Sequence, residues 1–185
     1  MRKNFGAKTW LYPMPVLIVG TYDENGTPNA MNAAWGGISE ENEISICIDD
    51  GHKTARNLVA AGAFTVSVAD VNTLIAADYV GIVSANNEPN KIEKAGVTAV
   101  KSESVNAPIF TEFPFILECR VKSYDVESCR LVGEIINVSV DESILTDGKI
   151  DLSKFSPLTY DPANHDYVAL GAKSGKAFCD GKALK

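Results

Sequence analysis

The part of the chain best suited to bind an anion is the motif His52-Lys53-Thr54-Ala55-Arg56-Asn57. It follows the turn Asp49-Asp50-Gly51, and we expect it to open a short helix. At the start of a helix, free backbone N–H groups and the helix dipole both favour negative charge. Two cations, a hydroxyl and an amide at this place therefore predict a site for a phosphate-bearing ligand. The alternative is structural, with Thr54 as a simple cap and the cations in water.

Segments typical of strands surround this motif, and several of them alternate between apolar and polar residues, as half-buried strands do. The predicted strands span residues 16–22, 28–34, 43–48, 64–68, a stretch from 113 onwards, and 130–140. The first two flank Asp23-Glu24-Asn25-Gly26, which has the Asn-Gly signature of a hairpin turn. The predicted helices span residues 53–61, ended by Gly62, and 72–80, capped by Asp70.

Strands joined by hairpins and short helices favour a mainly β (α+β) fold, with an antiparallel sheet closed into a small barrel. A doubly wound parallel sheet would need a glycine-rich first turn, and Gly20-Thr21-Tyr22-Asp23 offers no G-x-G-x-x-G. No linker or repeat interrupts the chain. We therefore expect one domain over residues 1–185, with residues 158–185 as a wrapping C-terminal tail.

Composition narrows the class of protein. The formal charge of −7 and the lack of a Lys/Arg-rich run argue against a nucleic-acid partner. A bound phosphate is still compatible with this net charge. Salt screens charges that lie more than about 8 Å apart, so the residues nearest to the phosphate determine the electrostatic potential there. No apolar run has the length of a membrane span, and no signal peptide is visible. Four cysteines without CxxC spacing and two distant histidines predict no metal site and a cytoplasmic protein with reduced thiols.

Several segments, in order along the chain, together resemble the flavin reductase-like family and, within it, the flavoredoxin-type branch. They are Pro13-Met14-Pro15-Val16, Ile18-Val19-Gly20-Thr21, residues 28–38, Ile44-Ser45-Ile46-Cys47-Ile48, the motif from His52 to Asn57, Gly133-Glu134-Ile135, residues 167–171 and residues 175–178. The resemblance implies an antiparallel split β-barrel with a few short flanking helices, and FMN as the cofactor.

The same resemblance implies a set of cofactor-binding residues: Asn29, Asn32, Ala33, Trp35, Lys53, Thr54, Asn57, Ser84, Ala85 and Lys91. Lys53, Thr54 and Asn57 would hold the phosphate, and the segment from Asn29 to Trp35 would lie along the isoalloxazine. Two of these assignments have plain alternatives. Trp35 would otherwise be a barrel-core aromatic, and Lys91 a solvated surface lysine.

One departure from the family concerns a histidine that many relatives carry ahead of the Gly-Glu pair. Residues 127–134 contain none. Cys129 or Arg130 are candidates to take its place, and His165 is a candidate near the flavin mouth; the role of all three stays open. We assign no catalytic residue and no metal ligand, because the flavin itself would carry the electron chemistry.

We therefore expect an FMN-dependent oxidoreductase that passes electrons from a reduced nicotinamide or a protein donor to an acceptor, as a flavoredoxin-like carrier. One alternative is an NAD(P)H-dependent flavin reductase that supplies diffusible reduced flavin. Another is a non-redox β-barrel binding module. Family resemblance also implies a homodimer. The sequence identifies neither the donor nor the acceptor, leaves NADH against NADPH open, and does not say whether FMN is prosthetic.

Overall fold

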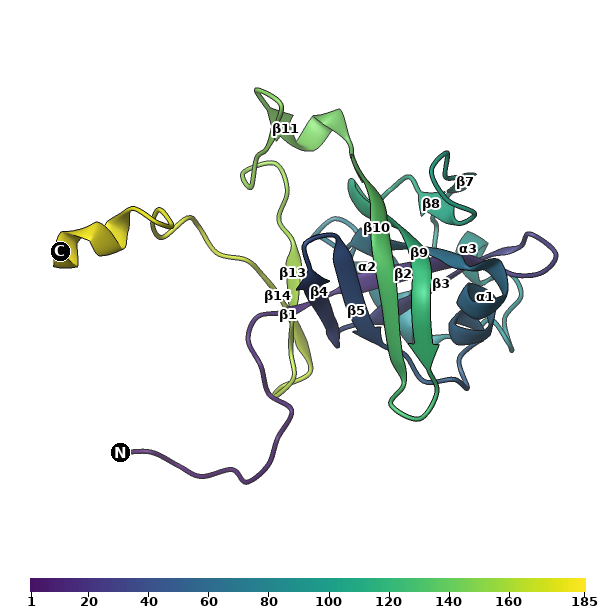
Figure 1. Ribbon diagram of the computed structural model, residues 1–185, viewed down its shortest axis with the longest axis horizontal. Helices are drawn as coiled ribbons and strands as arrows, with labels where there is room; N and C mark the ends of the chain where they lie inside the picture. Colours follow the sequence, from purple (N-terminus) through teal and green to yellow (C-terminus); the bar gives the residue numbers. More distant parts are fainter.

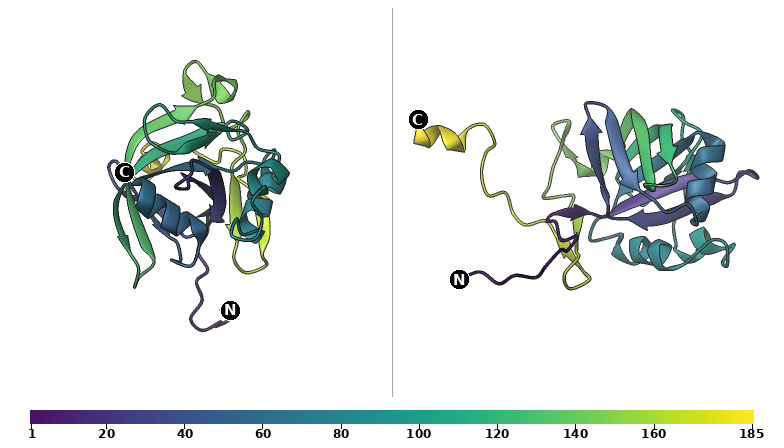
Figure 2. Two further views of the ribbon diagram at one scale, coloured as in Figure 1. Left: turned by 90° about the vertical axis from the view of Figure 1, so that its right-hand side faces the viewer. Right: turned by 60° about the horizontal axis from the view of Figure 1, so that its bottom comes forward.

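The computed structural model describes residues 1–185, and its centre is a seven-stranded antiparallel sheet in the order β3-β2-β6-β9-β10-β5-β4 (Figure 1). The strands are β2 (Leu17–Tyr22), β3 (Pro28–Ala33), β4 (Gly36–Glu40), β5 (Glu43–Cys47), β6 (Ala63–Val68), β9 (Phe115–Asp125) and β10 (Arg130–Val140). The sheet curls into an open barrel (Figure 2). The predicted fold class, a mainly β antiparallel split barrel, is confirmed, and the parallel alternative is wrong.

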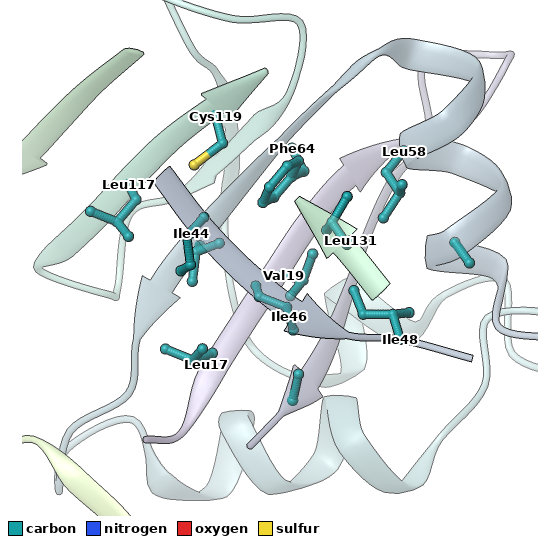
Figure 3. Packing of buried hydrophobic residues seen from close by; sticks show 13 residues of the cluster. Leu17, Val19, Ile44, Ile46, Ile48, Leu58, Phe64, Leu117, Cys119 and Leu131 are labelled. Carbon is teal, nitrogen blue, oxygen red and sulfur yellow. The ribbon is translucent and has the colours of Figure 1, made fainter. Parts of the chain in front are cut away.

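A hydrophobic core fills the barrel. Side chains from β2, β5, β6, β9 and β10 point toward one another inside it (Figure 3). Strand β2 is buried on both faces, because Leu17 and Val19 face this core whereas Ile18 faces a second core outside the barrel. Both faces of this strand therefore read as apolar, which is why the sequence predicts it so clearly.

Short helices cover the barrel at one end and on one side. Helix α1 (Lys53–Ala61) lies across one end, inserts Ala55 and Leu58 into the core, and stops at Gly62, whose φ of 67° is left-handed (Figure 2). Helix α2 (Leu74–Ile82) packs its buried Ala77 and Val80 against the outside of the barrel in the second core, and α3 (Lys91–Lys94) follows. No helix is long and apolar enough to cross a membrane.

Three smaller sheets complete the fold. They pair β1 (Met14–Pro15) with β13 (Leu158–Asp161) and β14 (Asp166–Ala169), β7 (Ala99–Lys101) with β8 (Pro108–Phe110), and β11 (Leu145–Thr146) with β12 (Lys149–Ile150). The first of these sheets brings the C-terminal part of the chain back to its N-terminal part. Residues 170–185 are all exposed and extend away from the barrel (Figure 1).

The short strands of these smaller sheets and helix α3 were not predicted, and two further elements differ from the expectation. Helix α2 begins at Leu74 rather than at 72, because the Asp70 carboxylate accepts the backbone N–H groups of Asn72 and Thr73 in a turn ahead of the helix. Strand β4 was not predicted, since it starts at Gly36-Gly37 and all but its first residue are exposed. That all of residues 1–185 form one domain stays a prediction.

Candidate functional site

A small cavity of about 210 Å³ lies where β3, the start of α1, the end of α2 and α3 meet. Most of the predicted cofactor residues line it: Asn29, Lys53, Thr54, Ser84, Ala85 and Lys91. These residues come from four separate parts of the sequence. The fold therefore gathers donors and cations around a space large enough for a small polar group.

The start of α1 supplies free backbone donors to this cavity. His52 has an extended backbone (φ −73°, ψ 140°), and no side chain caps the helix. The backbone N–H groups of Lys53 and Thr54 have no acceptor within the protein. Free donors at the positive end of a helix dipole form an anion site.

Lys91 adds a buried cation to the same cavity. The residue as a whole is only 3% exposed, and its Nζ, which is open to the cavity, forms no ion pair or hydrogen bond within the protein. Burial lowers the pKa of its ammonium to about 8. The neighbouring Lys94 is different, because it forms an ion pair with Glu88 at the surface. An unpaired buried ammonium costs free energy unless a ligand supplies the missing negative charge. The alternative reading of Lys91 as a solvated surface lysine is wrong, and its role in binding a cofactor stays a prediction.

Lys53 also borders the cavity, but it has a partner. Its Nζ lies 3.1 Å from Asp23 Oδ2, in the hairpin turn between β2 and β3. Hydrogen bonds from the Thr27 backbone N–H and from Lys53 help to keep the pKa of Asp23 below its ordinary value, although burial opposes this. One ammonium N–H is therefore used in holding Lys53 in place, and the others remain available to a ligand.

Asn29 and Thr54 form a buried pair at the wall of the cavity. Asn29 Nδ2 donates to Thr54 Oγ1 over 2.8 Å, which leaves the Thr54 hydroxyl proton free to donate onward. Asn29 is 2% exposed, and its Oδ1 has no partner in the protein. A buried acceptor without a donor is unusual in a folded protein and commonly marks a place where a ligand or water binds.

A larger cavity of about 530 Å³ adjoins the first and shares Met31 and His52 with it. Asn32, Ala33 and Trp35, the remaining predicted residues along β3 and beyond it, line this second cavity. Trp35 is 59% exposed, so the alternative that it is a barrel-core aromatic is wrong. We call the first space the anion cavity and the second the ring cavity.

Asn32 is held rigidly at the ring cavity. Its Nδ2 donates to the Ala77 carbonyl (3.1 Å) and to the Tyr167 hydroxyl (3.3 Å). Tyr167 in turn donates to Asp78 Oδ1 over 3.0 Å, and burial together with this bond raises the pKa of Tyr167 to about 12. With both amide protons used, Asn32 offers only its Oδ1 to a ligand, as an acceptor.

Two polar residues of the α1 motif do not reach either cavity. Asn57 is buried and donates to Thr21 Oγ1 over 3.2 Å, so the structure places it inside the fold instead of at the phosphate position. Arg56 donates to the Gly51 carbonyl and to Asn86 Oδ1, which ties α1 to the loop that follows α2. The Arg56 side chain therefore helps to hold in place the loop after α2, which forms part of the wall of the anion cavity, although Arg56 does not line that cavity.

Sequence reasoning missed several residues of the ring cavity. The α1 cap and β5 with the turn after it contribute His52, Cys47 and Asp49, the β9–β10 turn contributes Ser128, and β13 contributes Tyr160. Cys129, a candidate for the place of the family's histidine, also lines this cavity. Tyr160 reaches the cavity through the distant pairing of β13 with β1, which leaves no local signal. The Tyr160 hydroxyl forms a hydrogen bond with His165 Nδ1 over 2.6 Å, so His165 contacts a lining residue without lining the cavity itself. Arg130 does not line the cavity either.

Comparison with known proteins places this arrangement among flavoproteins. Residues 9–169 match the family described as the flavin reductase like domain. A flavoredoxin of Desulfovibrio vulgaris (Miyazaki F) is 38% identical, with a TM-score of 0.93 over 98% of this chain and 100% of that one. A flavoredoxin from Methanosarcina acetivorans is 28% identical, with a TM-score of 0.88 over the whole of both chains. An uncharacterized protein of Archaeoglobus fulgidus is 31% identical over 78% of this chain and 81% of its own length.

Proposed function

The chain belongs to the flavin reductase-like family, in its flavoredoxin branch, and we propose that it binds FMN and acts as an electron carrier. The single observation that carries the proposal is the unpaired Lys91 ammonium, buried in a cavity that also receives the free N–H groups of α1. A phosphate dianion satisfies all of these groups at once. Charge-assisted hydrogen bonds of this kind contribute about 1.5–3 kcal/mol each.

The residues present fit the whole cofactor. Lys91, Thr54, Lys53 and the start of α1 would hold the phosphate, and the ring cavity would take the planar ring system. Ala33 is small enough to let the backbone of β3 approach the ring. Asn32 Oδ1 would accept a ring N–H, and Trp35 would limit access of water from the open side.

When bound, FMN supplies the two-electron and one-electron chemistry that side chains lack. The protein would position the ring, exclude water and set the charge around it. No nucleophile–base pair is needed for this role. The electron donor would be a reduced nicotinamide, NADH or NADPH, or another protein, and the acceptor a small molecule or protein.

The absorption spectrum of freshly purified protein, followed by anaerobic titration with NADH and then NADPH, tests the proposal. A carrier should show a bound-flavin spectrum and be reduced stoichiometrically by its donor. Rapid oxidation of NAD(P)H that depends on added free flavin would identify a flavin reductase instead. A colourless protein that fails to bind added FMN would favour a non-redox β-barrel module and would refute the proposal.

A further inference from the structure

Two cysteines from distant parts of the sequence line the ring cavity. Cys47 ends β5, and Cys129 lies in the turn between β9 and β10. All four cysteines of the chain are free thiols, but only these two line this cavity: Cys119 is buried in the barrel core and Cys179 lies in the exposed C-terminal segment. The two thiols therefore share one chemical environment that the proposed function does not use.

The β5–β10 ladder brings the two residues together. Cys47 is paired with Arg130, the residue directly after Cys129, and the Ile48 backbone N–H donates to the Cys129 carbonyl over 2.8 Å. Opposed residues of an antiparallel pair lie about 4.5–5.5 Å apart at Cα, and the next residue lies about 3.8 Å along the chain. These spacings put the two Cα atoms about 5.5–6.7 Å apart, within the range that a disulfide spans.

The turn around Cys129 also suits such a bond. Cys129 has a positive φ of 55° and lies directly ahead of β10, so the regular alternation of a strand does not fix the direction of its side chain. Cys47 Sγ lies 4.0 Å from the carbonyl oxygen of Ser128, the residue directly before Cys129. Cys129 Sγ lies 3.7 Å from the Val126 carbonyl oxygen of the same turn. A bond between the two sulfur atoms would need both side chains to turn away from these carbonyl contacts.

We propose that Cys47 and Cys129 are a redox-active thiol pair that reduces small-molecule disulfides with electrons from the flavin. This inference rests on the proposed function for its electron source. Because Cys47 is exposed and Cys129 is half-buried, Cys47 reacts first with the external disulfide and Cys129 reacts second. The exposed thiolate attacks the external disulfide, as solvent-accessible attacking thiols do.

The reaction balances in three steps. The Cys47 thiolate attacks R–S–S–R, forming a Cys47–S–S–R bond and releasing one thiolate, which takes up a proton as R–SH. The Cys129 thiolate then attacks Cys47 Sγ, forming the internal disulfide and releasing the second R–SH. Finally, the internal disulfide accepts two electrons from the reduced flavin and two protons, its S–S bond breaks, and both thiols return while the flavin is oxidised.

The pair is tested first on flavin-free protein, by thiol titration and mass spectrometry after incubation with glutathione disulfide. The denatured protein should fall from four free thiols to two, with the Cys47 and Cys129 peptides crosslinked and no glutathione retained. Cys129→Ser should instead trap one glutathione on Cys47. The control Cys179→Ser should fall from three thiols to one. A wild-type protein that keeps four thiols, retains glutathione on Cys47, or crosslinks another cysteine would overturn the pair, whereas glutathione on the exposed Cys179 is separated by the Cys179→Ser control.

Electron transfer is tested separately on FMN-loaded protein that carries the internal disulfide. Anaerobic photoreduction should restore both thiols, whereas flavin-free protein under the same light should keep its disulfide. A disulfide that persists beside fully reduced flavin would overturn the electron-transfer step. If the protein binds no FMN, the proposed function and this step fall together, while the titration of flavin-free protein still decides whether the thiol pair exists.

Discussion

Lys91 is the site residue whose burial is hardest to explain without a bound ligand. A lysine that is 3% exposed usually has a carboxylate or several carbonyl oxygens around its ammonium, and Lys91 has neither. This unfavourable burial of a lysine occurs at the cavity where free backbone N–H groups and a hydroxyl also converge. The local charge at this point is therefore positive, although the chain as a whole carries −7.

Replacing this lysine should weaken FMN binding. Lys91→Gln removes one charge-assisted hydrogen bond to the phosphate, and we expect a loss of about 1.5–3 kcal/mol, roughly a tenfold to 150-fold increase in Kd. Fluorescence titration of flavin-free protein with FMN measures it. Lys94→Gln, on the same short helix but ion-paired at the surface, is the control and should leave Kd within about twofold. Equal affinities for the two variants would contradict the assignment.

Binding should also depend on pH through Lys91. Its pKa is about 8 in the flavin-free fold and about 10.4 when unfolded, so the unfolded chain binds more protons between these values. The free energy of unfolding of flavin-free protein should therefore rise with pH across this window, relative to Lys91→Gln. A bound phosphate favours the charged ammonium, so FMN binding should take up a proton there and weaken as pH rises.

Calorimetry at pH 9 in two buffers of different ionisation enthalpy measures this proton uptake directly. The uptake should disappear in Lys91→Gln and persist in Lys94→Gln. Binding without proton exchange in the wild-type protein would show that Lys91 is not beside the phosphate.

Individual site residues differ in how well the sequence predicts them. Lys53 and Thr54 are predictable because the start of a helix that follows a strand is a common place for anion binding. Asn57 follows from the same motif, but one turn of helix further on it faces Thr21 inside the fold. Tyr160 reaches the ring cavity only through long-range strand pairing, which no local pattern reveals. Cys129 was a candidate only through the family resemblance, because its turn has no local signal of its own.

Among the strands, β6 and β10 depend on the absence of a side chain at one position. A Cβ atom on Gly133 would lie 2.3 Å from Cζ of Phe64, a fully buried ring of the barrel core. Phe64 extends from β6 into the same core as Leu131 of β10 (Figure 3). Because Gly133 has no side chain, there is room for the Phe64 ring in the core.

Gly133→Ala should destabilise the barrel. Overpacking a dense core costs about 1–3 kcal/mol, because Phe64 or the backbone of β10 must shift. Urea unfolding measures the change. Gly37→Ala on β4 is the control, since an added Cβ there meets nothing within 4 Å. If both variants unfold at the same urea concentration, the barrel interior is packed differently from this description.

Elements with strong local signals are predictable, and elements defined by partners are not. The β2–β3 hairpin and α1 follow from alternation, an Asn-Gly turn and a C-terminal glycine. Strands β4, β13 and β14 carry little apolar alternation and exist because they pair with other strands: β4 with β5, β13 with β1, and β14 with β13. The curvature of the sheet is likewise a property of the assembled strands.

For the molecule as a whole, the C-terminal segment is the feature without an internal explanation. Residues 170–185 are exposed, including Phe178 at 99% and Leu184 at 95%. The expected homodimer offers a surface for these apolar side chains on a second copy, and this pairing stays a prediction.

Deleting residues 171–185 should shift a dimer toward monomer, because the apolar contacts of Phe178 and Leu184 with a second copy would be lost. Sedimentation velocity over a range of concentrations measures the shift. The circular-dichroism signal of the barrel strands should persist, since residues 171–185 extend away from the barrel (Figure 1). A full-length chain that sediments as a monomer, or a truncated chain that dimerises as strongly, would refute the prediction.

The most direct test of the account compares the affinity of flavin-free protein for FMN and for riboflavin, which lacks the phosphate. If the anion cavity holds the phosphate, FMN should bind at least about a hundredfold more tightly, since two or more charge-assisted hydrogen bonds are at stake. This preference should shrink in Lys91→Gln. Equal binding of the two flavins, or no binding of either, would contradict the account.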